Sequence, residues 1–254
     1  MKRWILKILY VFVLSNMVLL STVEGKSDSF WKFGKDKKKQ RVIAVFVDMS
    51  GSTNQARRTV YRNAFDKIYE NLQQGDRFLV GTITGRSYID FKPAVDAEIP
   101  KKSIWVNRIT FEQNLAKTKK DIQATVKKLL SQKRGTPRTE IINSLNIADK
   151  IFHNEERQKI LIVLSDMIQD SKEYNFDRAK VTDEYITRII RNRQKQDLIP
   201  KLNDVKVYVA GASAADNKKF RSIEKFWNRY FVVCGADFSL HRYGHSLLEF
   251  EKET

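Results

Sequence analysis

The sequence contains one cysteine and three histidines among 254 residues, and this scarcity limits the sites that it can build. The single Cys234 excludes an internal disulfide framework and any multi-cysteine zinc or iron–sulfur site. It follows two valines, which predicts a buried thiol rather than a nucleophile. His241 and His245 lie in a polar stretch near the C-terminus, where no carboxylate spacing suggests a metal pair. The chain therefore has little material for a metal site built on histidine or cysteine.

Proline and glycine are also few, with four and ten residues respectively. These counts exclude collagen-like and low-complexity chains, and no internal repeat is visible. The chain is 42% hydrophobic and 30% charged, which is typical of a folded globular protein. Its length allows one domain of ordinary size with additional segments. The formal net charge of +17 favours an anionic partner or surface without specifying which anion.

Residues 1–25, MKRWILKILYVFVLSNMVLLSTVEG, have the order of an export signal. Basic residues come first, and an apolar run from Ile8 to Leu20 follows, interrupted only by Ser15 and Asn16. The uninterrupted part is short for a membrane span, which predicts a cleaved signal peptide or, alternatively, a retained N-terminal membrane anchor. Both alternatives predict a secreted, periplasmic or membrane-anchored protein whose folded domain lies outside the cytoplasm.

Residues 26–40 are rich in lysine, with Phe30, Trp31 and Phe33 interleaved. One interpretation is a solvated basic linker, because like charges repel and keep such a segment open. The other is a juxtamembrane patch, in which the aromatic rings lie at the interface and the lysines attract an anionic membrane surface. The second interpretation suits a retained anchor. The folded domain is expected over residues 41–254.

Apolar runs and amphipathic stretches alternate through this domain. Strands are predicted at 42–47, 77–84, 159–164 and 205–210, with a shorter extended piece at 87–91 and a last short strand at 232–234. Helices are predicted at 53–74, 111–132, 140–153 and 178–194, and around Ile223–Phe231. This alternation predicts an α/β fold with a doubly wound, mostly parallel central sheet flanked by helices on both faces. In such folds ligands bind at the carboxyl ends of the strands.

Three segments expected at those strand ends are rich in oxygen donors. The first strand ends in Asp48-Met49-Ser50-Gly51-Ser52, the strand at 159–164 ends in Ser165-Asp166, and Gly135-Thr136-Pro137-Arg138-Thr139 opens a helix. Carboxylates and hydroxyls without histidine or thiol suit Mg²⁺, Mn²⁺ or Ca²⁺. Each residue taken singly is also an ordinary turn or helix-capping residue. The combination is what predicts a metal site.

At these residues the sequence resembles the von Willebrand factor type A domain family. VIAVFVDMSGST is similar to that family's first strand and metal loop, whose signature is an apolar strand followed by Asp-x-Ser-x-Ser. QQGDRFLVGTIT, TEIINSLNIA and KILIVLSD resemble the family's second-strand entry, its threonine-led helix and its later strand with a terminal Asp. The resemblance covers residues 41–237 and implies a Rossmann-like fold with a metal-ion-dependent adhesion site.

The resemblance also implies a ligand set for that site. The metal ligands would be Asp48, Ser50, Ser52, Thr139 and Asp166. In the family the hydroxyls coordinate directly or through water, and the aspartates often act through water. This leaves an open position for an acidic group of a partner.

Two departures from the family pattern affect this assignment. Thr136 could compete with Thr139, because the loop reads Gly-Thr-Pro-Arg-Thr where Gly-Gly-Thr is commoner. Met167 and Ile168 follow Asp166 where many members carry Gly, which affects the expected loop shape and not the ligand set. Arg138 would stand beside the metal and pair with an incoming carboxylate.

The sequence thus predicts an exported or membrane-anchored domain that binds a protein partner, as in cell adhesion, through Mg²⁺ or else Mn²⁺ or Ca²⁺. No nucleophile with a general base is evident beside the metal, so an enzyme is not expected. One alternative is a polyanion or nucleic-acid binder that uses the basic surface, although an export signal argues against nucleic acid. A more remote alternative is a metal-dependent phosphatase of the Asp-x-Asp-Gly-Thr type, in which Ser50 would replace the general acid.

Overall fold

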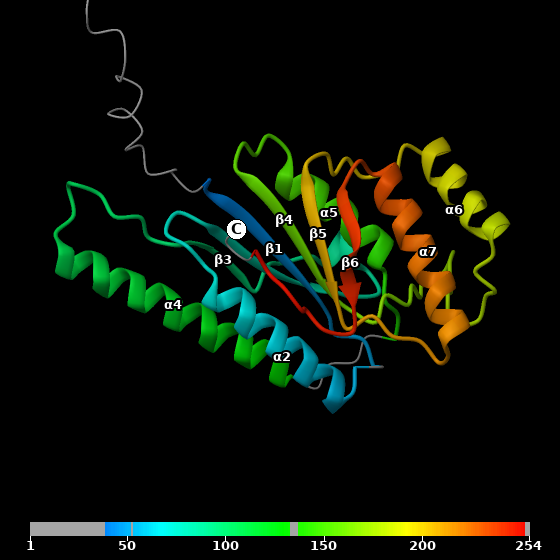
Figure 1. Ribbon diagram of the computed structural model, residues 1–254, viewed down its shortest axis with the longest axis horizontal. Coiled ribbons are helices and arrows are strands. Elements are labelled where there is room, and N and C mark those ends of the chain that lie inside the picture. The colour runs from blue at the N-terminus through cyan, green and yellow to red at the C-terminus, as the bar shows by residue number, and fades with distance from the viewer. Residues whose placement is uncertain (1–38, 52, 133–136, 252–254) are drawn as a thin grey trace, which may run out of the picture. The chain divides into compact units, whose positions relative to one another are not determined.

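The computed structural model describes residues 39–251 except for residues 52 and 133–136. Its centre is a six-stranded sheet with the order β3-β2-β1-β4-β5-β6 (Figure 1). The strands are β1 Arg41–Asp48, β2 Arg77–Ile83, β3 Val95–Glu98, β4 Gln158–Leu164, β5 Val205–Ala210 and β6 Asp237–Gly244. All neighbouring pairs are parallel except β2 and β3, which are antiparallel. The predicted α/β class with a mostly parallel sheet is confirmed. The predictions for residues 1–38 lie outside the described residues.

Helices cover both faces of this sheet. They are α2 Gln55–Glu70, α3 Ser87–Asp90, α4 Arg108–Ser131, α5 Ile141–Phe152, α6 Asp183–Lys195 and α7 Asn217–Val233. α2 and α4 lie on one face of the sheet, and α5, α6 and α7 lie on the other (Figure 1). Their apolar side chains pack into the two corresponding halves of the core. The long helices lie within a few residues of the predicted ranges. Among the described residues, no helix is both long enough and apolar enough to cross a membrane.

The continuous apolar run of β1 is explained by its central position. All eight of its residues are buried. Val42, Ala44 and Phe46 pack against one set of helices, while the intervening Ile43 and Val45 pack against the other. A strand covered on both faces needs apolar residues at every position, and this is why its sequence shows no alternation.

The order of the strands places a topological switch point between β1 and β4. β1 pairs in parallel with β2 on one side and with β4 on the other. The first half of the chain builds the sheet outwards from β1 in one direction, and the second half builds it in the other. The connections leaving β1 and β4 therefore diverge to opposite faces and leave a crevice at their carboxyl ends.

Two short predictions were wrong. Residues 87–91 were expected to be extended, but Ser87–Asp90 form the one-turn helix α3, and the antiparallel edge strand β3 follows it. The Ser87 hydroxyl accepts a hydrogen bond from Thr84 N at 2.9 Å and donates one to Thr84 O at 2.9 Å, which closes the turn before α3. Such side-chain closure of a turn leaves no periodic signal in four residues.

The last strand also differs from the prediction. Val232 and Val233 end α7, and Cys234 caps it. The helix continues that far because Phe226, Trp227, Tyr230 and Phe231 bury one face at helical spacing. The final strand is instead β6, whose mostly polar residues suit the exposed edge of a sheet. Cys234 is 3% exposed, which confirms the predicted buried thiol.

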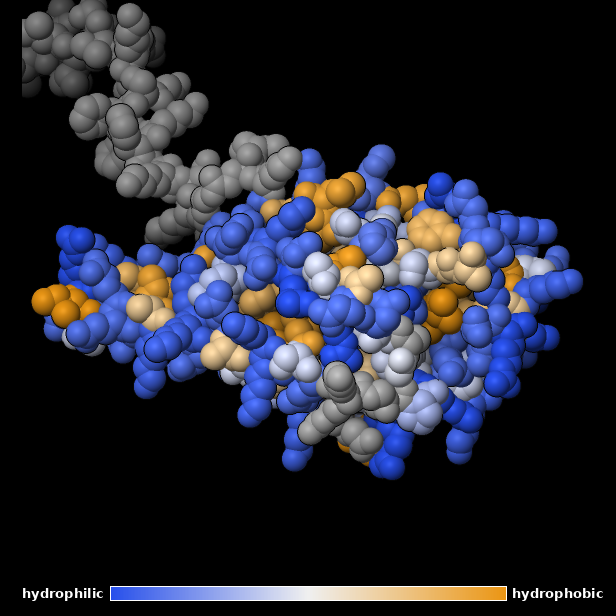
Figure 2. Space-filling model, turned by 90° about the horizontal axis from the view of Figure 1, so that it is seen from below, coloured by the Kyte–Doolittle hydropathy of each residue, from blue (hydrophilic) through white to orange (hydrophobic). Residues whose placement is uncertain are grey.

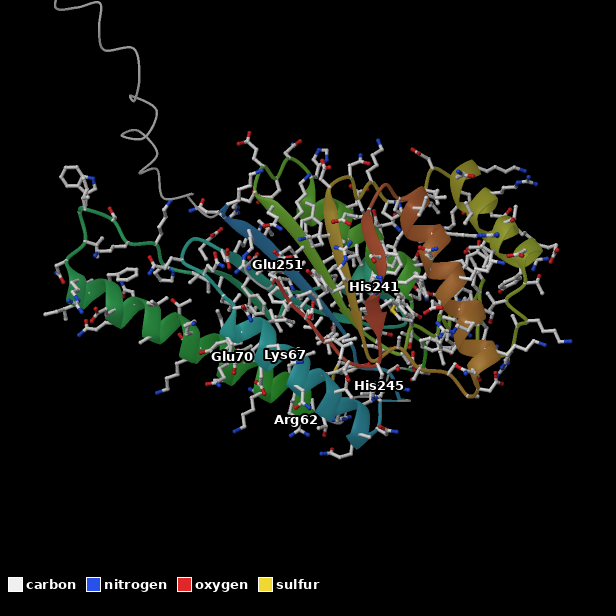
Figure 3. All side chains as sticks on the ribbon, viewed as in Figure 1. Arg62, Lys67, Glu70, His241, His245 and Glu251 are labelled. Carbon is white, nitrogen blue, oxygen red and sulfur yellow. The ribbon has the colours of Figure 1, made fainter. Side chains whose placement is uncertain are left out.

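The chain after β6 returns to the α2 side of the sheet. Leu247 and Phe250 join the core there, and Lys67 Nζ on α2 donates to Leu247 O at 2.7 Å. Glu251 accepts from Lys206 and Tyr208 of β5 (Figure 3). His241 on β6 and His245 just after it, both labelled in Figure 3, are exposed, in line with the surface role expected for them.

Candidate metal centre

Two buried carboxylates lie at the carboxyl ends of the two central strands. Asp48 is the last residue of β1, and Asp166 follows the end of β4 by two residues. The register of the two strands pairs Val47 with Leu164, so both loops leave the sheet at the same level. Asp48 is 0% exposed and Asp166 is 4% exposed. The crevice at the switch point therefore holds two acidic groups withdrawn from water.

Asp48 is held in place by its neighbours in both loops. Its Oδ1 accepts a hydrogen bond from Ser50 N at 2.8 Å, and its Oδ2 accepts one from Ser165 Oγ at 2.9 Å. Ser165 Oγ also accepts from Met167 N at 3.0 Å. The loop is tightened further by Thr53, whose hydroxyl donates to Asp48 O at 3.2 Å. These contacts fix the carboxylate and join the loops after β1 and β4.

Asp166 is paired with a cation that the sequence analysis did not anticipate. Its Oδ2 lies 2.9 Å from Arg57 Nη1, and its Oδ1 accepts from Ile168 N at 2.9 Å. Arg57 Nη2 also donates to Ser213 Oγ, at 3.1 Å. Arg57 lies in the first turn of α2, where the helix dipole disfavours a positive charge. A basic residue at this unfavourable position could have indicated from the sequence that Arg57 has an acidic partner. The sequence does not indicate which carboxylate that partner is.

The electrostatics of the crevice disfavour two negative charges. Burial raises the pKa of Asp48 despite its hydrogen bonds with Ser50 and Ser165. Burial, and then the charge of Asp48, raise the pKa of Asp166 to about 6, although Arg57 opposes this rise. Burial and both carboxylates also raise the pKa of Tyr61 well above its ordinary value. A bound cation would relieve all three effects at once.

Thr139 reaches the same region through its backbone. Thr139 N donates to Asp170 O and Asp170 N donates to Thr139 O, both at 2.9 Å. This pair ties the threonine loop to the segment after β4, and Glu140 N donates to Thr84 O beyond β2 at 3.0 Å. Thr139 and Ser50 are each 5% exposed. The structure thus gathers segments that carry four of the five predicted ligands at one edge of the sheet.

Three other residues were predicted at or beside this site: Ser52, Thr136 and Arg138. Ser52 and Thr136 lie outside the described residues. Arg138 is half-buried, and a Cβ on Gly85 would lie 3.1 Å from its Cβ, which places it against the loop after β2. A role for Arg138 in binding a partner stays a prediction.

The structure explains how Met167 can follow Asp166 at a position where glycine was expected. Its φ is 66°, in the left-handed region that glycine adopts most readily. The side chain is 0% exposed, and Trp227 Nε1 donates to Met167 O at 2.8 Å. Burial and this hydrogen bond offset the strain of the backbone. The loop can therefore keep its sharp bend without glycine.

A search against protein-family models found no match, and no curated protein matches the sequence. Solved structures do match. A von Willebrand factor type A structure from Catenulispora acidiphila is 14% identical, with a TM-score of 0.41, over 78% of this chain and 42% of that chain. Manganese-loaded TRAP protein from Plasmodium vivax is 15% identical, with a TM-score of 0.42, over 73% and 62%. The pilus adhesin SpaC from Lactobacillus rhamnosus GG is 15% identical, with a TM-score of 0.46, over 84% and 29%.

The likeness is remote. In each of these matches the chain covers less than two thirds of the length of the solved structure. At such low identities and TM-scores, no ligand or partner of these proteins is carried over to this chain. What the crevice can bind depends on its own side chains.

The donor set of the crevice fits a hard divalent cation. Asp48 and Asp166 supply carboxylate oxygens and the Ser50 side chain hydrogen-bonds to Asp48, with no nitrogen or sulfur donor among them. Thr139, on the adjacent loop, carries a further hydroxyl. Within the described residues, no group of three or more histidine, cysteine, aspartate or glutamate side chains could hold a metal. An ion here would therefore have only two carboxylates, and its remaining positions would fall to hydroxyls, water or a ligand from outside.

Proposed function

We propose that this domain binds a divalent metal ion, Mg²⁺ or else Mn²⁺ or Ca²⁺, in the crevice between β1 and β4 and uses it to bind a protein partner. The observation that carries the proposal is the pair of buried carboxylates on adjacent strand ends, Asp48 and Asp166, with raised pKa values. Burying two acidic groups together is costly, and Arg57, which pairs with Asp166, compensates only one negative charge. A bound divalent cation would compensate both, which supports a cation site here.

The ligand set would be Asp48, Ser50, Ser52, Thr139 and Asp166. Asp166 would exchange its Arg57 contact for the metal, because one carboxylate oxygen now faces that guanidinium. The bound metal would supply an electrophilic centre that accepts a carboxylate of the partner. Two protein carboxylates neutralise a divalent ion without giving the site a net negative charge, so a further carboxylate is not repelled and can fill an open coordination position. Arg138 would then pair with the same acidic group.

The proposed activity is binding rather than catalysis. A phosphatase of the Asp-x-Asp-Gly-Thr type needs a second carboxylic acid where this chain has Ser50, and a serine hydroxyl does not act as a general acid near neutral pH. The proposal includes the placement of the domain outside the cytoplasm, secreted, periplasmic or anchored, which rests on the pattern of residues 1–25. A cell-adhesion role follows from that placement and a protein partner.

Calorimetric titration of Mg²⁺ into the full chain tests the metal site. We expect saturable binding that is lost in Asp48→Asn and in Asp166→Asn. Asp96→Asn is the matched control, because Asp96 pairs with Arg77 at the exposed edge of the sheet, and it should bind as the unmodified chain does. Binding that survives in both site variants would disprove the assignment.

A second candidate is the binding of polyanions through the basic surface, for which the net charge of +17 is the observation. The two functions respond differently to conditions. Metal-dependent binding of a partner would be abolished by EDTA and depend only moderately on salt. Polyanion binding would survive EDTA and weaken steeply with salt as counterions compete for the surface.

A further inference from the structure

The connection between β3 and α4, together with the first turn of α4, carries an apolar tip that nothing in the described domain covers. The tip consists of Ile104, Trp105, Val106 and Ile109, which are 91%, 89%, 39% and 69% exposed. Figure 2 shows hydrophobic side chains gathered at the end of the domain where α4 begins, surrounded by hydrophilic ones. Single exposed apolar residues are ordinary, but four within six positions, including a tryptophan, require an explanation.

The backbone of the tip forms a hydrogen-bonded turn. Val106 N donates to Ser103 O at 3.3 Å, and Trp105 N donates to Ser103 Oγ at 3.3 Å. Asn107 caps α4 by accepting from Thr110 N at 2.9 Å, and the side chain of Phe111, at the end of the first turn, is buried. The backbone is thus fixed on both sides of the apolar residues. Their exposure follows from a defined conformation that presents them outwards.

The charged residues within the tip and directly before it are all positive. Lys101 and Lys102 precede it and Arg108 lies within it, all three exposed, and residues 100–109 contain no aspartate or glutamate. Arg108 pairs with Glu112 on the next turn of α4. Beyond that pair, α4 carries five lysines, Lys117, Lys119, Lys120, Lys127 and Lys128, against one further acid, Asp121. The tip therefore has an apolar end, and the residues before it and along α4 are mainly basic.

We propose that this tip inserts into the interface of an anionic lipid bilayer. Tryptophan favours the boundary between headgroups and acyl chains, isoleucine favours the acyl chains themselves, and lysines behind them attract anionic headgroups. A protein partner is a poorer fit, because a specific protein interface buries about 800 Å² on each side and this patch is one protruding turn. The tip shares no residue with the crevice at Asp48 and Asp166.

The test reports on the tip itself, so that membrane contacts of residues 1–40 do not obscure the result. An environment-sensitive fluorophore is attached to Ile104→Cys in the full chain. The native Cys234 is 3% exposed, so the introduced thiol is labelled selectively. The matched control is Val232→Cys on α7, which is 66% exposed but lies on the other face of the sheet from α4. Both proteins are mixed with vesicles of phosphatidylcholine, with or without phosphatidylglycerol.

We expect the emission at position 104 to shift to the blue on phosphatidylglycerol vesicles and to be quenched by brominated acyl chains. Position 232 should show neither effect. Lys101→Glu with Lys102→Glu should weaken the effect at position 104 several-fold and shift its dependence on salt, since the lysines supply the attraction.

An unchanged emission at position 104 on vesicles that bind the chain would overturn the proposal, because the tip would then remain in water. An equal shift on neutral vesicles would overturn the role given to the lysines. A blue shift that requires an added protein and no lipid would assign the tip to a protein partner instead.

Discussion

At the scale of single residues, the electrostatics of the crevice depend on which cation neutralises the Asp166 carboxylate. In the structure that cation is Arg57, whose Nη1 lies 2.9 Å from the carboxylate. The same guanidinium also lowers the pKa of Asp48 against the effect of burial. Arg57 therefore compensates part of the charge that a metal would otherwise neutralise. Arg57 would therefore compete with the proposed metal ion for Asp166.

Replacing Arg57 tests that competition. Arg57→Gln should tighten Mg²⁺ binding by about tenfold, because it removes a like charge worth about 1.4 kcal/mol beside the ion. The measurement is the calorimetric Kd at low salt. Arg62→Gln removes the same charge from an exposed position on the same helix and should leave Kd within about twofold. Weaker binding in Arg57→Gln would instead assign this arginine a supporting role in the metal site.

The raised pKa of Asp166 predicts how the metal-free protein responds to pH. Its folded-state pKa of about 6 exceeds its ordinary value of 3.8, so the native state binds more protons between these values than the unfolded state. The contribution of this group to stability is therefore fully present below pH 4 and is lost as pH rises through 6. In EDTA, the urea midpoint should respond to pH in this way, and Asp166→Asn should flatten the response. If Asp166→Asn kept the pH dependence of the unmodified chain, that dependence would not arise from the raised pKa of Asp166.

At the scale of elements, a second buried pair supports the sheet at the end opposite to the crevice. Arg41 at the start of β1 donates from its backbone N and from its side chain to Asp76, which lies just before β2. Arg41 also donates to Asn71 O at the end of α2. Gly75, with a φ of 85°, allows the chain to turn between α2 and β2. This cluster joins β1, α2 and β2 at one point.

Breaking this pair should affect stability and leave metal binding unchanged. Asp76→Asn leaves the Arg41 guanidinium buried beside a neutral group, and we expect the free energy of unfolding to fall by about 3 kcal/mol. Asp96→Asn breaks the exposed pair with Arg77 and should cost less than about 1 kcal/mol. Urea denaturation measures both variants. The Kd for Mg²⁺ in Asp76→Asn should match the unmodified chain, since the cluster lies at the amino end of β1.

At the scale of the whole molecule, binding of the proposed metal ion would be linked to folding. A ligand that binds only the native state stabilises it by about 2.7 kcal/mol at a concentration of one hundred times its Kd. In a domain of this size, each kcal/mol shifts Tm by about 2–4 °C. The net charge of +17 also makes stability sensitive to ionic strength, which must be kept constant in such measurements.

We therefore expect Mg²⁺ to raise the Tm of the full chain, relative to Na⁺ at equal ionic strength, and EDTA to reverse the effect. Asp48→Asn should abolish the rise, because it removes one of the two carboxylates. Differential scanning calorimetry provides the measurement. A rise of equal size in Asp48→Asn would attribute the effect to the basic surface rather than to the crevice.

Much of the fold could be predicted because its main signals are local. The apolar runs that become β1, β4 and β5 lie next to one another in the sheet, and the helical spacing of Phe226, Trp227 and Tyr230 marks the buried face of α7. The edge elements could not be predicted in the same way. β6 is mostly polar and partly exposed because it lies at the edge of the sheet, and α3 is a single turn held by Ser87. Short or exposed elements carry little periodic signal.

The sequence by itself determined the class of the fold and the position of Asp48 and Asp166 after apolar strands, because both follow from burial patterns within a few residues. Only the tertiary structure decided that Ser165 donates to Asp48 across 117 residues, that Arg57 faces Asp166, and that the tip at Ile104 protrudes uncovered. These contacts depend on strand register and on how helices cross the sheet. Such quantities are set by the packing of distant segments, and no local pattern encodes them.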